Sequence, residues 1–182
     1  MKEQLRISPI KWLSDAPITI PNPASVIGAF RPGTMKIVKF KGAHRFYRAA
    51  GWDSTRGEMA SAFGSWWADE IELVKISQKM NMYKNWLPDE LLRKALPAQY
   101  RGATALCEDW NDMREMYKLD LPPQEEIEGL VGIASAQPKK STLDVNSRQT
   151  PMLPGGAEQV FFKKTPTLSS INPLWIRSER LW

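Results

Sequence analysis

Prolines divide this sequence into short segments and so limit the secondary structure that it can form. Of the 14 prolines in the 182 residues, Pro9, Pro17, Pro21, Pro23 and Pro32 fall in the first part of the chain. A proline lacks a backbone donor and restricts the residue before it, so residues 1–33 cannot form a long helix. We expect this part to be an irregular lead-in that wraps over the core, with a short edge strand at 18–20.

Alternating and β-branched residues predict strands in both halves of the chain. The first two are expected at 35–40 and 44–50, and the turn Lys41-Gly42 between them favours a hairpin. A polar loop over 51–57 should follow. Three later strands are expected at 113–121, where Pro122-Pro123 ends the strand, at 130–134 and at 158–162. Residues 138–150 are polar and lack a core pattern, which indicates a loop.

Helices are expected between these two groups of strands. The first should begin near Ala68 and end before Pro88. Its apolar stripe is predicted to consist of Ile71, Val74, Gln78 and Met82, with Leu73, Ile76 and Met80 beside it. A shorter helix over 90–96 should be capped by Asp89 and closed by Pro97, and a further helical turn or two is expected at 104–110.

This order of elements predicts an α+β fold with helices packed on a split or curved antiparallel sheet. We divide the chain into the Pro-rich lead-in 1–33, a core domain 34–164 and an extended tail 165–182, which Trp175 and Trp182 could anchor.

Several kinds of chemistry have no residues to perform them in this sequence. Cys107 and His44 are single, so an internal disulfide framework and a His- or Cys-rich metal site are excluded. No Walker A loop, GxGxxG, GxSxG or HExxH motif occurs. There is no apolar run that could span a membrane and no apolar stretch of a signal peptide at the start, so we expect action in the cytoplasm, including that of a target cell.

The net charge of +5 and the pI of about 9.3 favour anionic partners such as nucleic acid, phosphates or an acidic protein. Acidic residues are interspersed with the basic ones over most of the chain, so an ordinary solvated surface explains the same excess.

Three short segments combine residues that could bind a ligand, and each also has a structural interpretation. Arg48 follows an aromatic residue in Tyr47-Arg48 and could donate two hydrogen bonds to a phosphate, or could simply extend from a strand edge. In Gly64-Ser65-Trp66-Trp67 the serine could hold a ribose and the tryptophans could stack on a planar ring, or the tryptophans could pack in the core.

The third segment is a Gly-rich turn, Pro154-Gly155-Gly156, that leads into Glu158-Gln159 and an apolar strand. Because successive strand side chains point to opposite faces, one of these two polar side chains should point to each face. At least one of them should therefore face a ligand site or solvent, since burying either without a partner is costly.

The order of these segments resembles ADP-ribosyltransferase-type domains, and in particular the C-terminal toxin domains of polymorphic bacterial toxins. The likeness covers roughly residues 40–163, and its specificity lies in the order of the motifs. The motifs are Tyr47-Arg48, Gly64-Ser65-Trp66-Trp67, Trp110-Asn111, Leu119-Asp120-Leu121-Pro122, Ile133-Ala134-Ser135-Ala136-Gln137 and Gly155-Gly156-Ala157-Glu158-Gln159. The resemblance implies an ADP-ribosyltransferase-like split sheet and NAD as the substrate.

The resemblance also implies roles for single residues. Arg48, with Tyr47 beside it, would hold the pyrophosphate or the nicotinamide ribose. Ser65 would brace the catalytic side chain, and Trp66 or Trp67 would stack near the nicotinamide. Glu158 or Gln159 would contact the ribose hydroxyl while the glycosidic bond breaks, and no metal would be needed.

One departure from the family leaves the reaction open. The position immediately before the apolar run of the last strand, where transferases usually carry the catalytic acid, is Gln159. Hydrolysis of NAD therefore stands beside transfer to a protein or nucleic-acid acceptor, with an acidic immunity protein as a possible partner. Two other hypotheses remain: a non-enzymatic basic module that binds nucleic acid, and a structural protein of a phage or secretion assembly.

Overall fold

The structure is a computed structural model that describes residues 1–15, 23–50, 65–81, 89–105, 113, 115–139, 150–163 and 176–179. Its elements follow one another along the chain as β1 (Lys2–Leu5), α1 (Pro9–Ser14), α2 (Pro23–Gly28), β2 (Lys36–Lys41), β3 (His44–Ala50), β4 (Trp66–Asp69), α4 (Glu70–Asn81), α5 (Asp89–Thr104), β5 (Glu115–Leu121), β6 (Glu126–Ile133), β7 (Gln137–Pro138), β8 (Met152–Leu153), β9 (Glu158–Phe162) and β10 (Ile176–Glu179).

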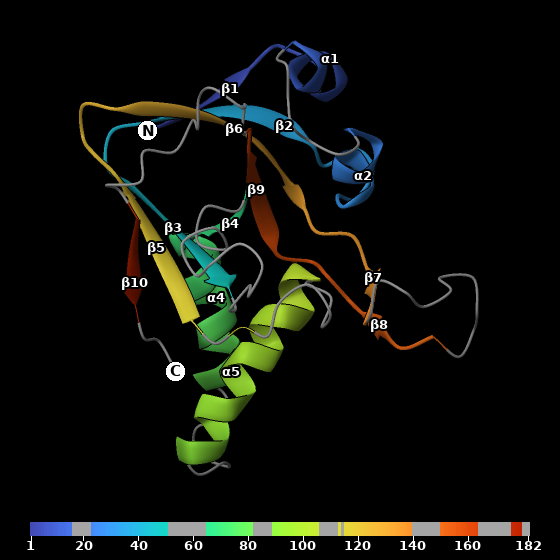
Figure 1. Cartoon of the computed structure of the whole chain (residues 1–182), viewed down its shortest axis with the longest axis vertical. Coiled ribbons are helices and arrows are strands. Elements are labelled where there is room, and N and C mark those ends of the chain that lie inside the picture. The colour runs from blue at the N-terminus through green and yellow to red at the C-terminus, as the bar shows by residue number, and fades with distance from the viewer. Residues whose placement is uncertain are drawn as a thin grey trace, which may run out of the picture.

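Eight of the described strands form one sheet in the order β1-β2-β6-β9-β4-β3-β5-β10, and the described neighbours in it are antiparallel. Strand β4 belongs to two parts of this sheet. Trp66 and Trp67 pair with β9, whereas Ala68 and Asp69 pair with β3. We therefore distinguish a first leaf, β1-β2-β6-β9-β4, from a second leaf, β4-β3-β5-β10. In Figure 1, β2 and β6 of the first leaf run across the view, and β3 and β5 of the second leaf descend steeply from the same end.

The expected hairpin between 35–40 and 44–50 is wrong, although both strands exist. Gly42, with a φ of 78°, turns the chain between β2 and β3. Strand β2 then pairs with β1 and β6, and β3 pairs with β4 and β5. The turn joins one leaf to the other, because packing the apolar faces of the two leaves against each other buries more surface than a two-stranded ribbon would.

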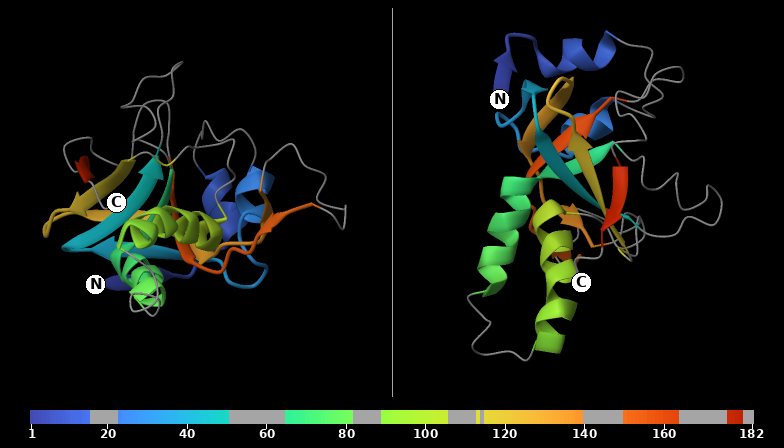
Figure 2. Two further views of the ribbon diagram at one scale, coloured as in Figure 1. Left: turned by 90° about the horizontal axis from the view of Figure 1, so that it is seen from below. Right: turned by 90° about the vertical axis from the view of Figure 1, so that its left-hand side faces the viewer.

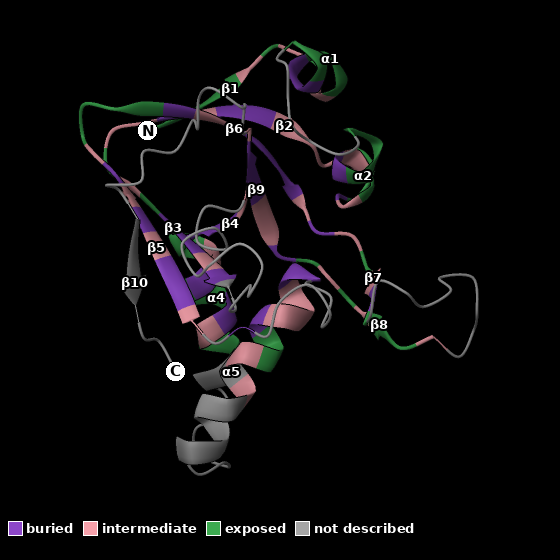
Figure 3. Ribbon diagram, viewed as in Figure 1, coloured by how far each residue is buried: buried purple, intermediate pink, exposed green. Residues whose placement is uncertain are grey.

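The core lies between the two leaves, on what we call the inner face. Its residues are buried and mostly large: Val38, Phe40, Phe46, Trp67, Tyr117, Leu119, Leu121, Ile127, Val131, Val160 and Phe162. Phe46 meets the rings of Phe40 and Phe162 edge-on, with centroids 4.9 and 5.1 Å apart. Figure 3 shows this burial as purple segments along β2, β5, β6 and β9.

Helices cover the outer faces of both leaves. On the first leaf, Trp12 and Leu13 of α1 and Val26 of α2 pack with Ile37 and Leu130. The second leaf packs against α4 and α5 through a cluster of Tyr47, Ala49, Ala68, Leu73, Ile76, Tyr100, Met113, Met116 and Ala157. Figure 2 shows α4 and α5 lying side by side and extending away from the sheet. The expected mixture of helices with a curved, mostly antiparallel sheet is thus confirmed.

The predicted stripe of α4 is wrong in its orientation. Leu73 and Ile76 face the sheet and are buried, whereas Ile71 and Val74 are 60% and 46% exposed. Both pairs recur at helical spacing, so periodicity alone could not tell which of them would meet the second leaf.

The predicted break at Pro97 is also wrong, since α5 continues through it to Thr104. A proline inside a helix costs about 3 kcal/mol through its missing donor and its steric clash. The half of α5 after Pro97 is held by tertiary contacts, because Tyr100 and Thr104 are buried against the second leaf and β9.

Other segments contain more structure than the sequence suggested. The lead-in contributes β1, α1 and α2, and Ile176–Glu179 of the tail forms β10 at the edge of the second leaf. Strands β7 and β8 pair at the two ends of the expected loop over 138–150. The expected edge strand at 18–20, the polar loop at 51–57, and Trp175 and Trp182 lie outside the described residues. No helix in the described ranges is long and apolar enough to cross a membrane.

Candidate functional site

The three candidate segments lead to neighbouring strands at the centre of the sheet. Arg48 lies on β3, Ser65 directly precedes β4, and Glu158 and Gln159 begin β9. The sheet order places β4 between β9 and β3. Segments from three distant parts of the sequence therefore meet on adjacent strands.

Arg48 lies at the inner face of β3, opposite Tyr117 of β5. Its Nη1 donates a hydrogen bond to the carbonyl of Trp66 at 3.0 Å, which places the guanidinium next to Ser65 in the chain. Burial lowers the pKa of Arg48 to about 10, although the group stays cationic at neutral pH. Arg48 thus contacts the backbone of the residue that follows Ser65 in the chain.

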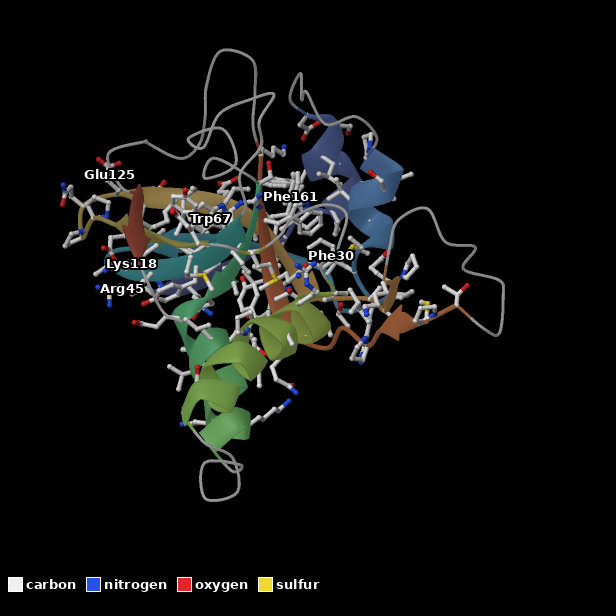
Figure 4. All side chains as sticks on the ribbon, turned by 60° about the horizontal axis from the view of Figure 1, so that its bottom comes forward. Phe30, Arg45, Trp67, Lys118, Glu125 and Phe161 are labelled. Carbon is white, nitrogen blue, oxygen red and sulfur yellow. The ribbon has the colours of Figure 1, made fainter. Side chains whose placement is uncertain are left out.

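Ser65 is half-buried, and its carbonyl accepts a hydrogen bond from the amide of Phe162 at 2.8 Å. The two tryptophans that follow it diverge. Trp67 is only 1% exposed and packs in the inner core. Trp66 lies on the outer face, where its ring centroid is 5.3 Å from that of Phe30 and 4.9 Å from that of Phe161. Figure 4 shows Phe30 and Phe161 near α2, apart from Trp67.

Tyr47, on the strand face opposite to Arg48, is buried under α5. Its carbonyl accepts a hydrogen bond from the hydroxyl of Tyr100 at 3.3 Å. Burial raises the pKa of Tyr100 to about 12. Tyr47 therefore links β3 to the helical layer in this structure.

The Gly-rich turn before β9 is tied to the end of α5. The amide of Gly155 donates to the carbonyl of Gly102 at 2.9 Å, and the amide of Ala157 donates to the carbonyl of Ala103 at the same distance. Gly155 has a φ of 66°, and a Cβ there would lie 2.5 Å from the carbonyl oxygen of Ala134. The turn needs glycine because the chain passes this closely over another backbone.

Gln159 continues this contact, since its Nε2 donates to the carbonyl of Thr104 at 2.5 Å. The last carbonyls of a helix lack partners within the helix, so Gly155, Ala157 and Gln159 together satisfy the carboxyl end of α5. The Gln159 amide is engaged on the outer face of the sheet, on the opposite side from Glu158.

Glu158 points to the inner face, as Val160 and Phe162 of the same strand do. It is 28% exposed, and its two carboxylate oxygens lie 3.6 Å from Lys36 Nζ and 3.9 Å from Lys2 Nζ. These lysines come from neighbouring strands, β2 and β1.

Asp69 is a carboxylate that the sequence interpretation did not single out. Its Oδ2 lies 2.9 Å from Lys2 Nζ, so Lys2 joins Asp69 and Glu158 in one cluster. Its Oδ1 accepts a hydrogen bond from the amide of Ile71 at 2.9 Å in the first turn of α4. An Asp directly before a helical pattern is the sequence signal that favours such a cap.

Arg48 and Glu158 occupy two ends of the same region. Trp66, which binds Arg48, is paired with Phe161, three residues along β9 from Glu158. Three strand residues span about 10 Å. Trp67 and Val160 lie between these ends and are buried in the inner core.

Some of the sequence motifs that carry the resemblance lie in described residues, and others do not. Leu119–Leu121 completes β5, and Gln137 begins β7. Gly64, Cys107 and the pair Trp110-Asn111 lie outside the described residues. Among the residues that are described, no three His, Cys, Asp or Glu side chains gather closely enough to hold a metal ion.

Comparison of this chain with protein families, with characterised proteins and with solved structures finds no match. The site is therefore interpreted from its own residues and from the order of its motifs.

Proposed function

We propose that this chain is an NAD-consuming toxin domain of the ADP-ribosyltransferase type, acting by transfer or by hydrolysis. The observation that supports this most is the placement of the Arg48, Ser65 and Glu158 segments on the adjacent strands β3, β4 and β9. In the sequence these segments lie far apart, so their meeting is not a consequence of local order.

In this proposal Arg48 and Glu158 have separate roles. Arg48 binds the pyrophosphate, for which a guanidinium is the preferred donor. Glu158 lies near the nicotinamide ribose and stabilises positive charge there as the bond from ribose C1 to the nicotinamide nitrogen breaks. The bonding electron pair leaves with nicotinamide, and water or an acceptor then bonds to C1 and loses a proton.

Between the two candidate residues of β9, Glu158 is the one that we assign to this role. The Gln159 amide already donates to Thr104 and faces the other side of the sheet. With Glu158 in this role the site contains a carboxylate, whereas Gln159 would supply only an uncharged amide. The ADP-ribosyltransferase-like fold itself is part of the proposal.

A basic module that binds nucleic acid has less support among the described residues. Lysines and arginines on the sheet lie in ion pairs with carboxylates: Lys36 with Glu158, Lys39 with Glu126 and Glu128, Lys41 with Glu3, and Arg45 with Glu70 and Asp120. Pairing of this kind lowers the positive potential that attracts a phosphate backbone.

NAD consumption with release of nicotinamide tests the proposal, first with purified protein and then with cell lysate added. We expect Glu158→Gln and Arg48→Lys each to slow the reaction by about 10²–10³, the usual loss when an electrostatic contact to a transition state is removed. Loss of NAD without acceptor indicates a glycohydrolase, and loss only with lysate indicates a transferase.

Glu126→Gln is the matched control, because Glu126 is an exposed carboxylate that pairs with Lys39 on another strand. It should leave the rate unchanged. If NAD survives both conditions with the folded wild-type protein, the proposal is wrong.

A further inference from the structure

Strand β1 supplies a cation, Lys2, that lies between the carboxylates of Asp69 and Glu158, and Lys36 of β2 is a second cation at Glu158. Lys2 Nζ lies 2.9 Å from Asp69 Oδ2, 3.9 Å from Glu158 Oε1 and 5.7 Å from the centroid of the Phe40 ring. Both carboxylates belong to the centre of the sheet, on β4 and β9, whereas Lys2 belongs to its edge. One side chain thus connects the edge strand to the candidate site.

Strand β1 is a short strand at the edge of the first leaf. It is four residues long and pairs on one side, with β2. Its first three side chains are exposed, and only Leu5 is partly buried. Besides the strand pairing, Glu3 lies 2.6 Å from Lys41, an ion pair of two exposed side chains, and the amino group of Met1 donates to the Lys41 carbonyl at 2.6 Å. Short edge segments with little buried apolar surface open locally at low free-energy cost.

We propose that β1 is a removable strap at the edge of the candidate site: docked on β2, it holds Lys2 against Glu158 and Asp69. When β1 is undocked, Glu158 keeps its ion pair with Lys36 of β2 and loses the one with Lys2, so its second oxygen becomes open to a cationic group of the substrate. Lys2 and a ribose that develops positive charge would compete for the same carboxylate, so the docked strap is autoinhibitory. The effect on catalysis rests on the proposed function, whereas the strap itself rests on the contacts of Lys2.

Chemical labelling of carboxylates measures, without any substrate, how far Lys2 shields Glu158. A water-soluble carbodiimide with excess glycine ethyl ester converts accessible carboxylates into amides, and peptide mass spectrometry gives the rate at Glu158, with the exposed Glu125 as an internal reference. We expect Lys2→Met to raise the rate at Glu158 by about two- to five-fold, the range for losing a partly exposed ion pair, while Glu125 is unchanged. Lys2→Arg should restore the wild-type rate.

A second variant separates undocking of β1 from simple loss of the lysine. Glu3→Lys places two cations together at Lys41 and keeps Lys2, so it should loosen β1, visible as faster hydrogen exchange over residues 2–5, and raise labelling of Glu158. Glu126→Lys is the matched control, since it reverses a charge on β6 and keeps both Glu3 and Lys41.

The proposal of a removable strap is wrong if Glu158 is labelled at the wild-type rate in Lys2→Met. It is also wrong if Glu158 is labelled at that rate in Glu3→Lys although the amides of β1 exchange faster. Faster labelling together with faster NAD loss supports both proposals. Faster labelling with no NAD loss in any variant supports the strap and refutes the proposed function.

Discussion

The two polar residues that begin β9 perform different tasks at the scale of single residues. Gln159 donates to the carbonyl of Thr104 at the end of α5, and Glu158 pairs with Lys36 and Lys2 on the inner face. An amide can donate to a carbonyl and a carboxylate cannot, so the order Glu-Gln matches the two surroundings.

Gln159→Glu should destabilise the protein by about 1–3 kcal/mol, because it leaves the Thr104 carbonyl facing a carboxylate. The unfavourable charge raises the pKa of the new carboxyl in the folded state. Its protonated form is therefore favoured by folding, and the penalty should shrink as the pH falls toward about 4. Urea unfolding at neutral and acidic pH measures this.

Gln78→Glu on the exposed surface of α4 is the control for Gln159→Glu and should have little effect. A penalty for Gln159→Glu that is small and does not change with pH would contradict the capping role.

Tyr100 gives a second prediction at this scale, through its buried hydroxyl. Tyr100→Phe loses the bond to the Tyr47 carbonyl and should cost about 1 kcal/mol near neutral pH. Because burial raises the pKa of Tyr100 to about 12, the contribution of its protonated hydroxyl is complete below about pH 10 and is lost as the pH rises toward 12. The wild type should thus lose its advantage over Tyr100→Phe in urea unfolding at about pH 11; a constant difference would argue against a buried hydroxyl.

At the scale of elements, the neighbours of a helix decide which of its faces is buried. Helix α4 has apolar residues on two faces, and the second leaf covers the one with Leu73 and Ile76. Helix α5 continues through Pro97. The carbonyls at its end accept hydrogen bonds from the turn before β9 and from Gln159 of β9, and these bonds stabilise its last turn.

The two faces of α4 should respond differently to truncation. Leu73→Ala removes buried surface and leaves a cavity, with an expected cost of about 2–5 kcal/mol. Ile71→Ala lies on the exposed face and should change the free energy of unfolding by less than about 0.5 kcal/mol. Chemical unfolding of both variants checks this, and equal losses would place α4 differently on the sheet.

At the scale of the whole molecule, the lead-in packs with central strands on the outer face of the first leaf. Trp12, Leu13, Val26 and Phe30 are buried with Phe161 of β9. Trp12 Nε1 also donates to Glu128 of β6 at 3.2 Å, and Lys163 Nζ lies 4.0 Å from the centroid of the Trp12 ring.

Trp12→Ala should therefore destabilise the entire sheet by about 3–5 kcal/mol, the usual cost of removing a large buried ring. Trp12→Phe keeps most of the apolar contact and loses the N–H donor, so a smaller loss of about 1 kcal/mol is expected. Thermal unfolding followed by circular dichroism reports both. A Trp12→Ala protein as stable as the wild type would mean that the lead-in is an appendage.

The sequence by itself determined the features that depend on neighbouring residues. Alternation and β-branching located β2, β3, β5 and β9, and Gly42 and Pro122 marked turns or ends, because these preferences act within a few residues. The same alternation predicted that Glu158 and Gln159 point to opposite faces.

Only the tertiary structure decided which distant segments meet. It separated β2 from β3 and turned Leu73 rather than Ile71 inward. It also joined Arg48 to the carbonyl of Trp66 and placed Lys2 beside Asp69 and Glu158. These contacts depend on how two leaves of a sheet bury their apolar faces together, and that burial is summed over residues far apart in the chain, where no local pattern records it.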